Sequence, residues 1–208
     1  MGKGNAFVKK GVLTCLAGCC IGMGVGMILY ANIGGDTVTV FQDGLHRLLH
    51  CSYGQASRIY NFVLIVAALL VARKYFGVGT IISALITGYA IDISFNALTA
   101  LALRLPVLAA LLLFLLGQTV YTFGLSLLIR CDLGMNGLDS LLYQVSDRFG
   151  AEYKYIRLGA DFLLTLIGYL MGGVVGAGTV ISIVCTGFMI DFFVRFEKRG
   201  KGSGALDK

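Results

Sequence analysis

Residues 79–92 read GTIISALITGYAID, and residues 178–191 read GTVISIVCTGFMID. Eight of these fourteen positions are identical, which is far more than chance gives. The similarity extends along the chain at an offset of about 100 residues, so that Asp36 corresponds to Asn136 and Asn61 to Asp161. The chain is therefore one unit, duplicated: residues 1–106 form the first repeat and residues 107–208 the second.

The composition is that of a polytopic membrane protein. Apolar residues make up 57% of the chain and charged residues 13%, with 29 glycines and a mean hydropathy of +0.84. The net charge of +6 does not indicate nucleic-acid binding, because the basic residues lie at the ends of apolar runs and not on one polar face. The six cysteines have neither CxxC spacing nor the pattern of a disulfide framework.

Six apolar runs are long enough to cross a bilayer as helices, three in each repeat. They lie at about 12–31, 59–76, 79–99, 107–129, 156–174 and 178–194. Between the first and second run of each repeat lies a shorter, one-sided helical pattern, near 38–49 and 138–149, which we expect to lie along the interface or to re-enter the protein. The sequence therefore predicts an all-α membrane protein with six transmembrane helices, in which each repeat carries one amphipathic interfacial or re-entrant helix.

An odd number of spans per repeat means that the second repeat enters the membrane upside down, so the prediction is a 3+3 inverted repeat. With the N-terminus inside, fourteen of the 17 basic residues fall on the cytoplasmic side. The three on the outer side are Arg47, Arg58 and Arg104. This bias predicts a multi-pass protein with both termini in the cytoplasm.

The duplicated stretch also carries the polar residues of the spans. Thr80, Ser83 and Thr87 share one helix face and Asp92 follows at its edge; the second repeat places the matching residues at Thr179, Ser182, Thr186 and Asp191. One hypothesis is a pair of solute or ion sites related by the repeat, since ionisable groups within spans are costly. The alternative is structural: hydroxyls bonded to their own helix, close helix packing at Gly88 and Gly187, and aspartates at helix ends near water.

Four further residues are candidate ligands at matched positions. Asn61 and Asp161 lie early in the second and fifth spans, as ligands or as helix-to-helix hydrogen bonds. Asp36 and Asn136 follow glycines at the entries to the amphipathic helices, where free N–H groups would face an anion or where the side chains are ordinary caps.

Glycines at four-residue spacing mark one packing face in the first span: Gly18, Gly22 and Gly26. Such a smooth stripe allows close helix contact, either within the protein or in a homodimer.

No enzyme is predicted, because the chain has no recognisable nucleophile triad, phosphate loop or dinucleotide fingerprint. His46, His50 and Cys51 would leave a metal shell incomplete, so neither a metal nor a cofactor is expected.

The glycine–aspartate entry at Gly34, its second copy at Gly134 and the GT…TG..ID signature resemble the YitT/YczE group of bacterial integral membrane proteins. The chain ends soon after its last apolar run, so it resembles the short, YczE-like branch without the soluble C-terminal domain of longer YitT-type members. The resemblance implies the bacterial cytoplasmic membrane. Two functions are expected from different classes: a transporter or facilitator of a small solute or ion that alternates between its repeats, or a non-transporting accessory protein that acts through a partner in the bilayer.

Overall fold

The computed structural model describes residues 3–71, 77–101, 106–131 and 137–183, and within them every regular element is a helix. The helices are α1 (Lys3–Ala31), α2 (Thr37–Leu49), α3 (Tyr53–Val71), α4 (Val78–Ala100), α5 (Val107–Cys131), α6 (Gly137–Phe149) and α7 (Tyr153–Leu170). Residues 177–183 are also helical. Four of the described helices contain stretches long and apolar enough to cross a membrane: Val8–Ala31, Tyr53–Val71, Gly79–Ala100 and Val107–Ile129. These stretches confirm the all-helical membrane class.

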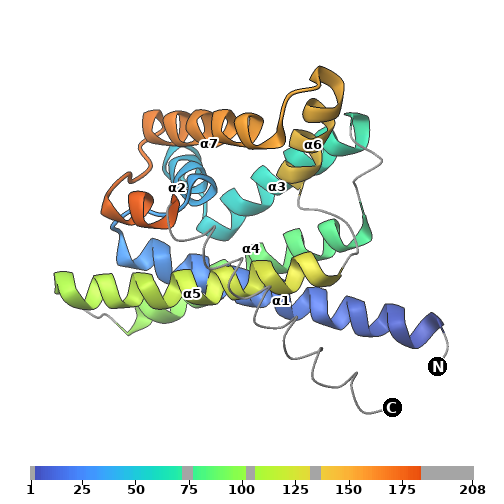
Figure 1. The fold of residues 1–208 in the computed structure, drawn as a ribbon. Helices are drawn as coiled ribbons and strands as arrows, with labels where there is room; N and C mark the ends of the chain where they lie inside the picture. Colours follow the sequence, from blue (N-terminus) through green and yellow to red (C-terminus); the bar gives the residue numbers. More distant parts are fainter. Residues whose placement is uncertain (1–2, 72–76, 102–105, 132–136, 184–208) are drawn as a thin grey trace, which may run out of the picture.

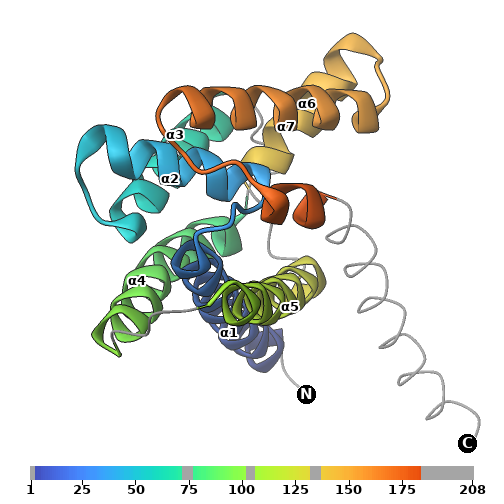
Figure 2. The same ribbon diagram turned by 90° about the vertical axis from the view of Figure 1, so that its left-hand side faces the viewer.

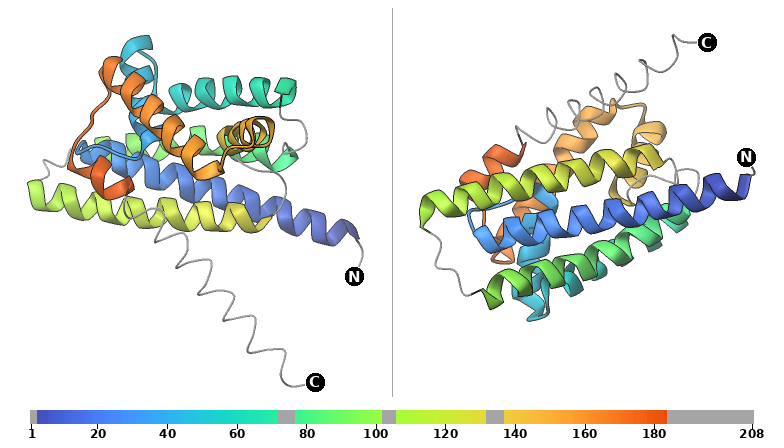
Figure 3. Two further views of the ribbon diagram at one scale, coloured as in Figure 1. Left: turned by 45° about the horizontal axis from the view of Figure 1, so that its top comes forward. Right: turned by 90° about the horizontal axis from the view of Figure 1, so that it is seen from below.

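The helices form two layers (Figure 1). One layer consists of α4, α1 and α5, which lie side by side with α1 in the middle (Figure 3). The other layer contains α2, α3, α6 and α7. In Figure 2, where α1 and α5 are viewed nearly along their axes, α2 runs across the view, so this short helix crosses the direction of the long ones.

Small residues allow α1 to occupy the middle of its layer. A Cβ atom at Gly22 would lie 2.5 Å from the Cβ of Ala90, which places the backbones of α1 and α4 in direct contact. A Cβ at Gly24 would lie 2.6 Å from the carbonyl oxygen of Gly117 on α5. Gly18 and Gly26 also face α4, so the predicted glycine stripe contacts the fourth helix of the same chain.

The two short helices enter the protein by their N-terminal ends. In α2, residues 39, 40 and 42–44 are buried while residues 47–49 are exposed; in α6, burial is likewise concentrated in the first six residues. Asp36 caps α2 by accepting a hydrogen bond from the Thr39 backbone N–H at 3.3 Å. Both helices pack against α3 and α7, which favours the re-entrant form of the prediction over a helix lying flat on the surface.

Glycines bring α2 and α7 into backbone contact. A Cβ at Gly44 would lie 2.4 Å from the carbonyl oxygen of Gly168, and a Cβ at Gly168 would lie 2.8 Å from the backbone of Phe41. These contacts hold the middle of α2 beside the C-terminal end of α7, and the start of α2 reaches the middle of α7, where charged side chains meet.

Candidate functional site

A cluster of charged side chains lies where α2, α6 and α7 meet. Arg157 on α7 donates from Nε to Oδ2 of Asp161 at 3.0 Å, and its Nη1 forms an ion pair with Asp139 near the start of α6. The Thr37 hydroxyl, at the start of α2, donates to the other Asp161 oxygen at 2.9 Å. Tyr153 donates to Asp139 at 2.8 Å. One guanidinium therefore bridges two carboxylates that come from two helices.

Asp36 joins this cluster from the end of the loop before α2. Its carboxylate accepts hydrogen bonds from the backbone N–H and the hydroxyl of Thr39, and from the Tyr121 hydroxyl of α5 at 3.1 Å. Burial raises the pKa of Asp36 above its ordinary value, while these hydrogen bonds and the charge of Arg157 act in the opposite direction. We refer to Asp36, Asp139, Arg157 and Asp161 as the central cluster.

The central cluster lies at the middle of the helices that surround it. Asp161, Tyr121 and Tyr60 are each within about two residues of the midpoints of α7, α5 and α3, judged from the bounds of these helices. The cluster also draws on both repeats, because Asp36 belongs to the first and its other members to the second. With all four groups ionised it carries a formal charge of −2. Ionisable groups enclosed among membrane-spanning helices normally face a protein interior or a wet path and mark functional sites.

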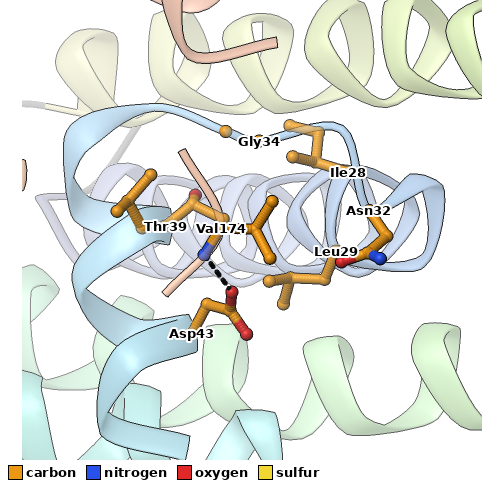
Figure 4. A pocket seen from close by; sticks show the side chains of 9 residues that line it. Ile28, Leu29, Asn32, Gly34, Thr39, Asp43 and Val174 are labelled. Atoms are coloured by element: carbon orange, nitrogen blue, oxygen red, sulfur yellow. Dashed lines mark hydrogen bonds between the residues drawn. The ribbon is translucent and has the colours of Figure 1, made fainter. Parts of the chain in front are cut away.

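A small pocket adjoins the central cluster (Figure 4). Thr39, which bonds Asp36, lines one part of it, and Asp43 lines another. Asp43 is held by the Val174 backbone N–H at 2.7 Å and by Arg47 Nε at 3.0 Å. The volume open to the centre of a water molecule is about 10 Å³, which is close to the space that one water needs.

Asp92 lies apart from the central cluster and binds the start of α3. Its carboxylate accepts from the Gly54 backbone N–H at 2.7 Å and from the Ser52 hydroxyl at 3.0 Å, and it pairs with Arg58 at 3.5 Å. Gly54 makes this approach feasible, since a Cβ there would lie 2.0 Å from the Gly88 carbonyl oxygen. This geometry is that of a capping residue that ties α4 to α3.

The hydroxyls of the duplicated stretch are buried in helix contacts. Thr87 donates to the Gly18 carbonyl of α1 at 3.3 Å, and Ser83 donates to the Thr80 carbonyl of its own helix at 3.2 Å. In the second repeat, Ser182 donates to Oε1 of Gln118 on α5 at 3.0 Å.

Among the remaining candidates, Thr179 accepts a hydrogen bond from the Gly176 backbone N–H at 3.4 Å, at the start of the last described helical stretch. Asn61 donates to the Ser57 carbonyl at 2.9 Å, one turn back in its own helix, whereas its counterpart Asp161 belongs to the central cluster. The candidates Asn136, Thr186, Gly187 and Asp191 lie outside the described residues.

The sequence matches, over residues 8–195, the family described as a family of unknown function, DUF6198. The chain belongs to this family. It is 28% identical over 185 residues to an uncharacterized protein of Haemophilus influenzae, covering 86% of this chain and 80% of that protein. It is 24% identical over 152 residues to the uncharacterized membrane protein YczE of Bacillus subtilis, covering 73% of this chain and 69% of YczE.

A third relative, the uncharacterized protein YyaS of Bacillus subtilis, is 18% identical over 179 residues, covering 86% of this chain and 89% of YyaS. No solved structure matches. The similarity to YczE and the apolar helices confirm the resemblance to the YczE-like group and a multi-pass membrane protein.

In this family member, the sequence pattern missed two features of the site. Arg157 is one of the basic residues from which the sequence predicts topology, yet in the structure it pairs with two carboxylates. Gln118, Thr122 and Ser126 are almost fully buried on α5, at 1%, 0% and 2% exposure. They stand 100 residues after Gly18, Gly22 and Gly26, so the repeat offset would have identified this polar stripe as the counterpart of the glycine stripe.

Proposed function

We propose that the protein is a transporter or facilitator of a small solute or ion, working by alternating access between two inverted repeats. The observation that carries the proposal is the central cluster itself. Charged side chains from both repeats meet beside the midpoint of α7 and beside the N-terminal ends of the two short helices, α2 and α6. Secondary transporters built from inverted repeats place their sites at such a midplane, at the ends of discontinuous helices.

Two sets of contacts support the inverted-repeat part of the proposal. The short helix of each repeat packs against the second long helix of the other repeat, α2 against α7 and α6 against α3. The pair Gly18 and Ser83 between α1 and α4 recurs 100 and 99 residues later as Gln118 and Ser182. Recurrence of the same neighbours with the repeats exchanged is what a pseudo-two-fold axis produces.

The accessory function remains the second candidate, because of the packing around α4. Thr80, Ser83 and Thr87 are between 4% and 9% exposed and face the glycine stripe of α1. A dry contact of this kind needs no solute path, and it favours a protein that acts by binding a partner in the bilayer.

Cysteine labelling from the two sides of the membrane separates these functions. Thr37 is 6% exposed and touches Asp161, so Thr37→Cys, in a chain whose six native cysteines are replaced, places a thiol at the central cluster. Alternating access predicts that an impermeant thiol reagent labels this cysteine from either face of oriented proteoliposomes. Ala17→Cys is the control. Ala17 lies on α1 where it contacts α5 and is 0% exposed, so a cysteine at this position should stay unlabelled. A folded Thr37→Cys protein that is silent from both faces would favour the accessory function.

A further inference from the structure

Tyr60 presents a buried hydroxyl to the central cluster. This tyrosine is 7% exposed, and among the described residues its hydroxyl has no hydrogen-bond partner. The charges that act on it are those of Asp36, Arg157, Asp139 and Asp161, and Asp36 acts most strongly. A buried hydroxyl without a partner is energetically costly. Such a group is expected to gain a partner in another state of the site.

Asp36 is the group from which this partner can come. Its carboxylate accepts from Tyr121 of α5, and the charge of Arg157 on α7 acts on it. Its own charge acts on Tyr60 of α3, together with those of Asp139 on α6 and Asp161 on α7. Arg157 is already engaged by Asp139 and Asp161, so it pairs with neither oxygen of Asp36. A protonated Asp36 would carry an O–H donor, from which the Tyr60 oxygen can accept.

The geometry favours a proton over a larger occupant. Within the described residues, no three His, Cys, Asp or Glu side chains are gathered as ligands of one metal ion. The pocket beside Thr39 has space for about one water, which is enough for proton exchange but not for an organic solute. Thr39 lines that pocket and donates a hydrogen bond to Asp36. Thr37, the residue after Asp36, donates a hydrogen bond to Asp161.

We infer that Asp36 is the proton-binding residue of this membrane protein and that the central cluster couples proton binding to the transport cycle. This inference rests on the proposed function. A proton from water on one face forms an O–H bond at an Asp36 carboxylate oxygen, and the new acid donates to Tyr60. The same O–H bond breaks when the proton leaves to water on the other face. The charge of the cluster thereby changes from −2 to −1 and back.

Infrared titration of the purified protein in lipid, from about pH 3 to about pH 9, tests the inference directly, because a protonated carboxyl has its own C=O stretching band. We expect a band that persists above the usual aspartate pKa of about 3.9 and then titrates away. Asp36→Asn should remove it. Asp147→Asn, at an exposed position on α6, should leave it unchanged.

Tyr60→Phe provides a second test, which holds even where Asp36→Asn fails to fold. Loss of the oxygen that accepts from the acid form should move the titration midpoint to lower pH. An unmoved midpoint, no such band in the wild type, or a band that survives in Asp36→Asn would overturn the inference. The inference would also be overturned if the wild type lacked the band and its melting temperature rose when Na⁺ replaced choline. That result would indicate that the site binds a metal cation.

The infrared titration and the cysteine labelling can give different outcomes, so proton binding and transport are tested separately. A titrating Asp36 in a protein whose Thr37→Cys is labelled from neither face would retain the proton site and contradict transport. Labelling from both faces without a titrating carboxyl would retain transport and contradict proton binding.

Discussion

At the scale of single residues, the two repeats place different chemistry at matched positions. Asp36 caps α2 where the second repeat has Asn136, and Asp161 pairs with Arg157 where the first repeat has Asn61 beside Ser57. At each of these two matched pairs, only one of the two residues is charged. Replacing Asp36 or Asp161 by asparagine therefore introduces the residue that the other repeat has at that position. Such a substitution keeps the shape of the side chain and most of its hydrogen bonds.

Asp36→Asn should change how stability depends on pH. Burial raises the folded-state pKa of Asp36, so the ionised carboxylate disfavours the folded protein above that pKa, and this cost disappears as pH falls towards the ordinary value. Asparagine caps a helix as well as aspartate does. We expect the variant to melt at a higher temperature than the wild type at neutral and alkaline pH, with the difference shrinking on acidification. Melting curves in detergent check this, and parallel pH profiles of the two proteins would contradict it.

Arg157 should be coupled energetically to Asp161. Arg157→Gln leaves two carboxylates without their cation, and we expect a loss of about 2 kcal/mol of stability. Adding Asp161→Asn removes one unpaired charge and should recover part of that loss, which a double-mutant cycle measures. Lys154 and Glu152 form an ion pair whose side chains are 66% and 67% exposed. A double-mutant cycle on this pair should give a coupling energy of less than about 1 kcal/mol. Equal coupling at both pairs would contradict a special role for Arg157.

At the scale of elements, α2 is held by glycine contacts as well as by its own apolar side chains. The backbones of α2 and α7 touch at Gly44 and Gly168, and the start of α2 is pinned by Asp36. His50 ends α2 in the left-handed conformation, with φ of 50°. The start of α2 is thus held by hydrogen bonds and one face of it by backbone contact with α7.

Gly168→Ala should disturb this contact while leaving α7 itself intact. The added methyl would lie 2.8 Å from the Phe41 backbone, so α2 and α7 must separate, at a cost of about 1 to 3 kcal/mol. Gly159→Ala on the same helix is the control, because nothing lies within 4 Å of a Cβ there. Thermal unfolding should show a clear loss for the first variant and none for the second. Similar stability of the two variants would mean that α2 is not held by this contact.

At the scale of the whole molecule, charge distribution predicts orientation. By sequence position, fourteen of the 17 basic residues fall on one side if both termini are cytoplasmic, although one of the fourteen, Arg157, belongs to the central cluster. The proposed two-fold relation requires an odd number of spans in each repeat. The four candidate spans of the described residues correspond to the first four spans of the prediction. The fifth and sixth spans are part of the proposal.

Reporter fusions test the orientation. Fusions after Lys74 and after Arg104 should report opposite sides of the membrane, cytoplasmic for the first and external for the second, because one span lies between them. A fusion after Lys10 should agree with the one after Lys74. The same signal from Lys74 and Arg104 would contradict the six-span count.

The sequence alone was enough for the membrane class and the short amphipathic helices, it predicts the duplication, and it offered a cap as one of two roles for Asp36. These features are local: hydropathy, a repeat offset and a capping residue act over a few turns of one helix. The sequence also identified which helix faces are polar or smooth, as with Ser83, Thr87 and the glycines of α1, since helical periodicity is local too.

Only the tertiary structure decided which partner each face meets. Periodicity shows that a residue faces inward, but a contact such as Thr37 with Asp161 joins positions 124 residues apart, and it forms only because Gly44 and Gly168 bring α2 against α7. For the same reason Asp92 became a cap on α3, and Arg157 became the cation between two carboxylates. Long-range packing, and not local pattern, therefore assembled the central cluster.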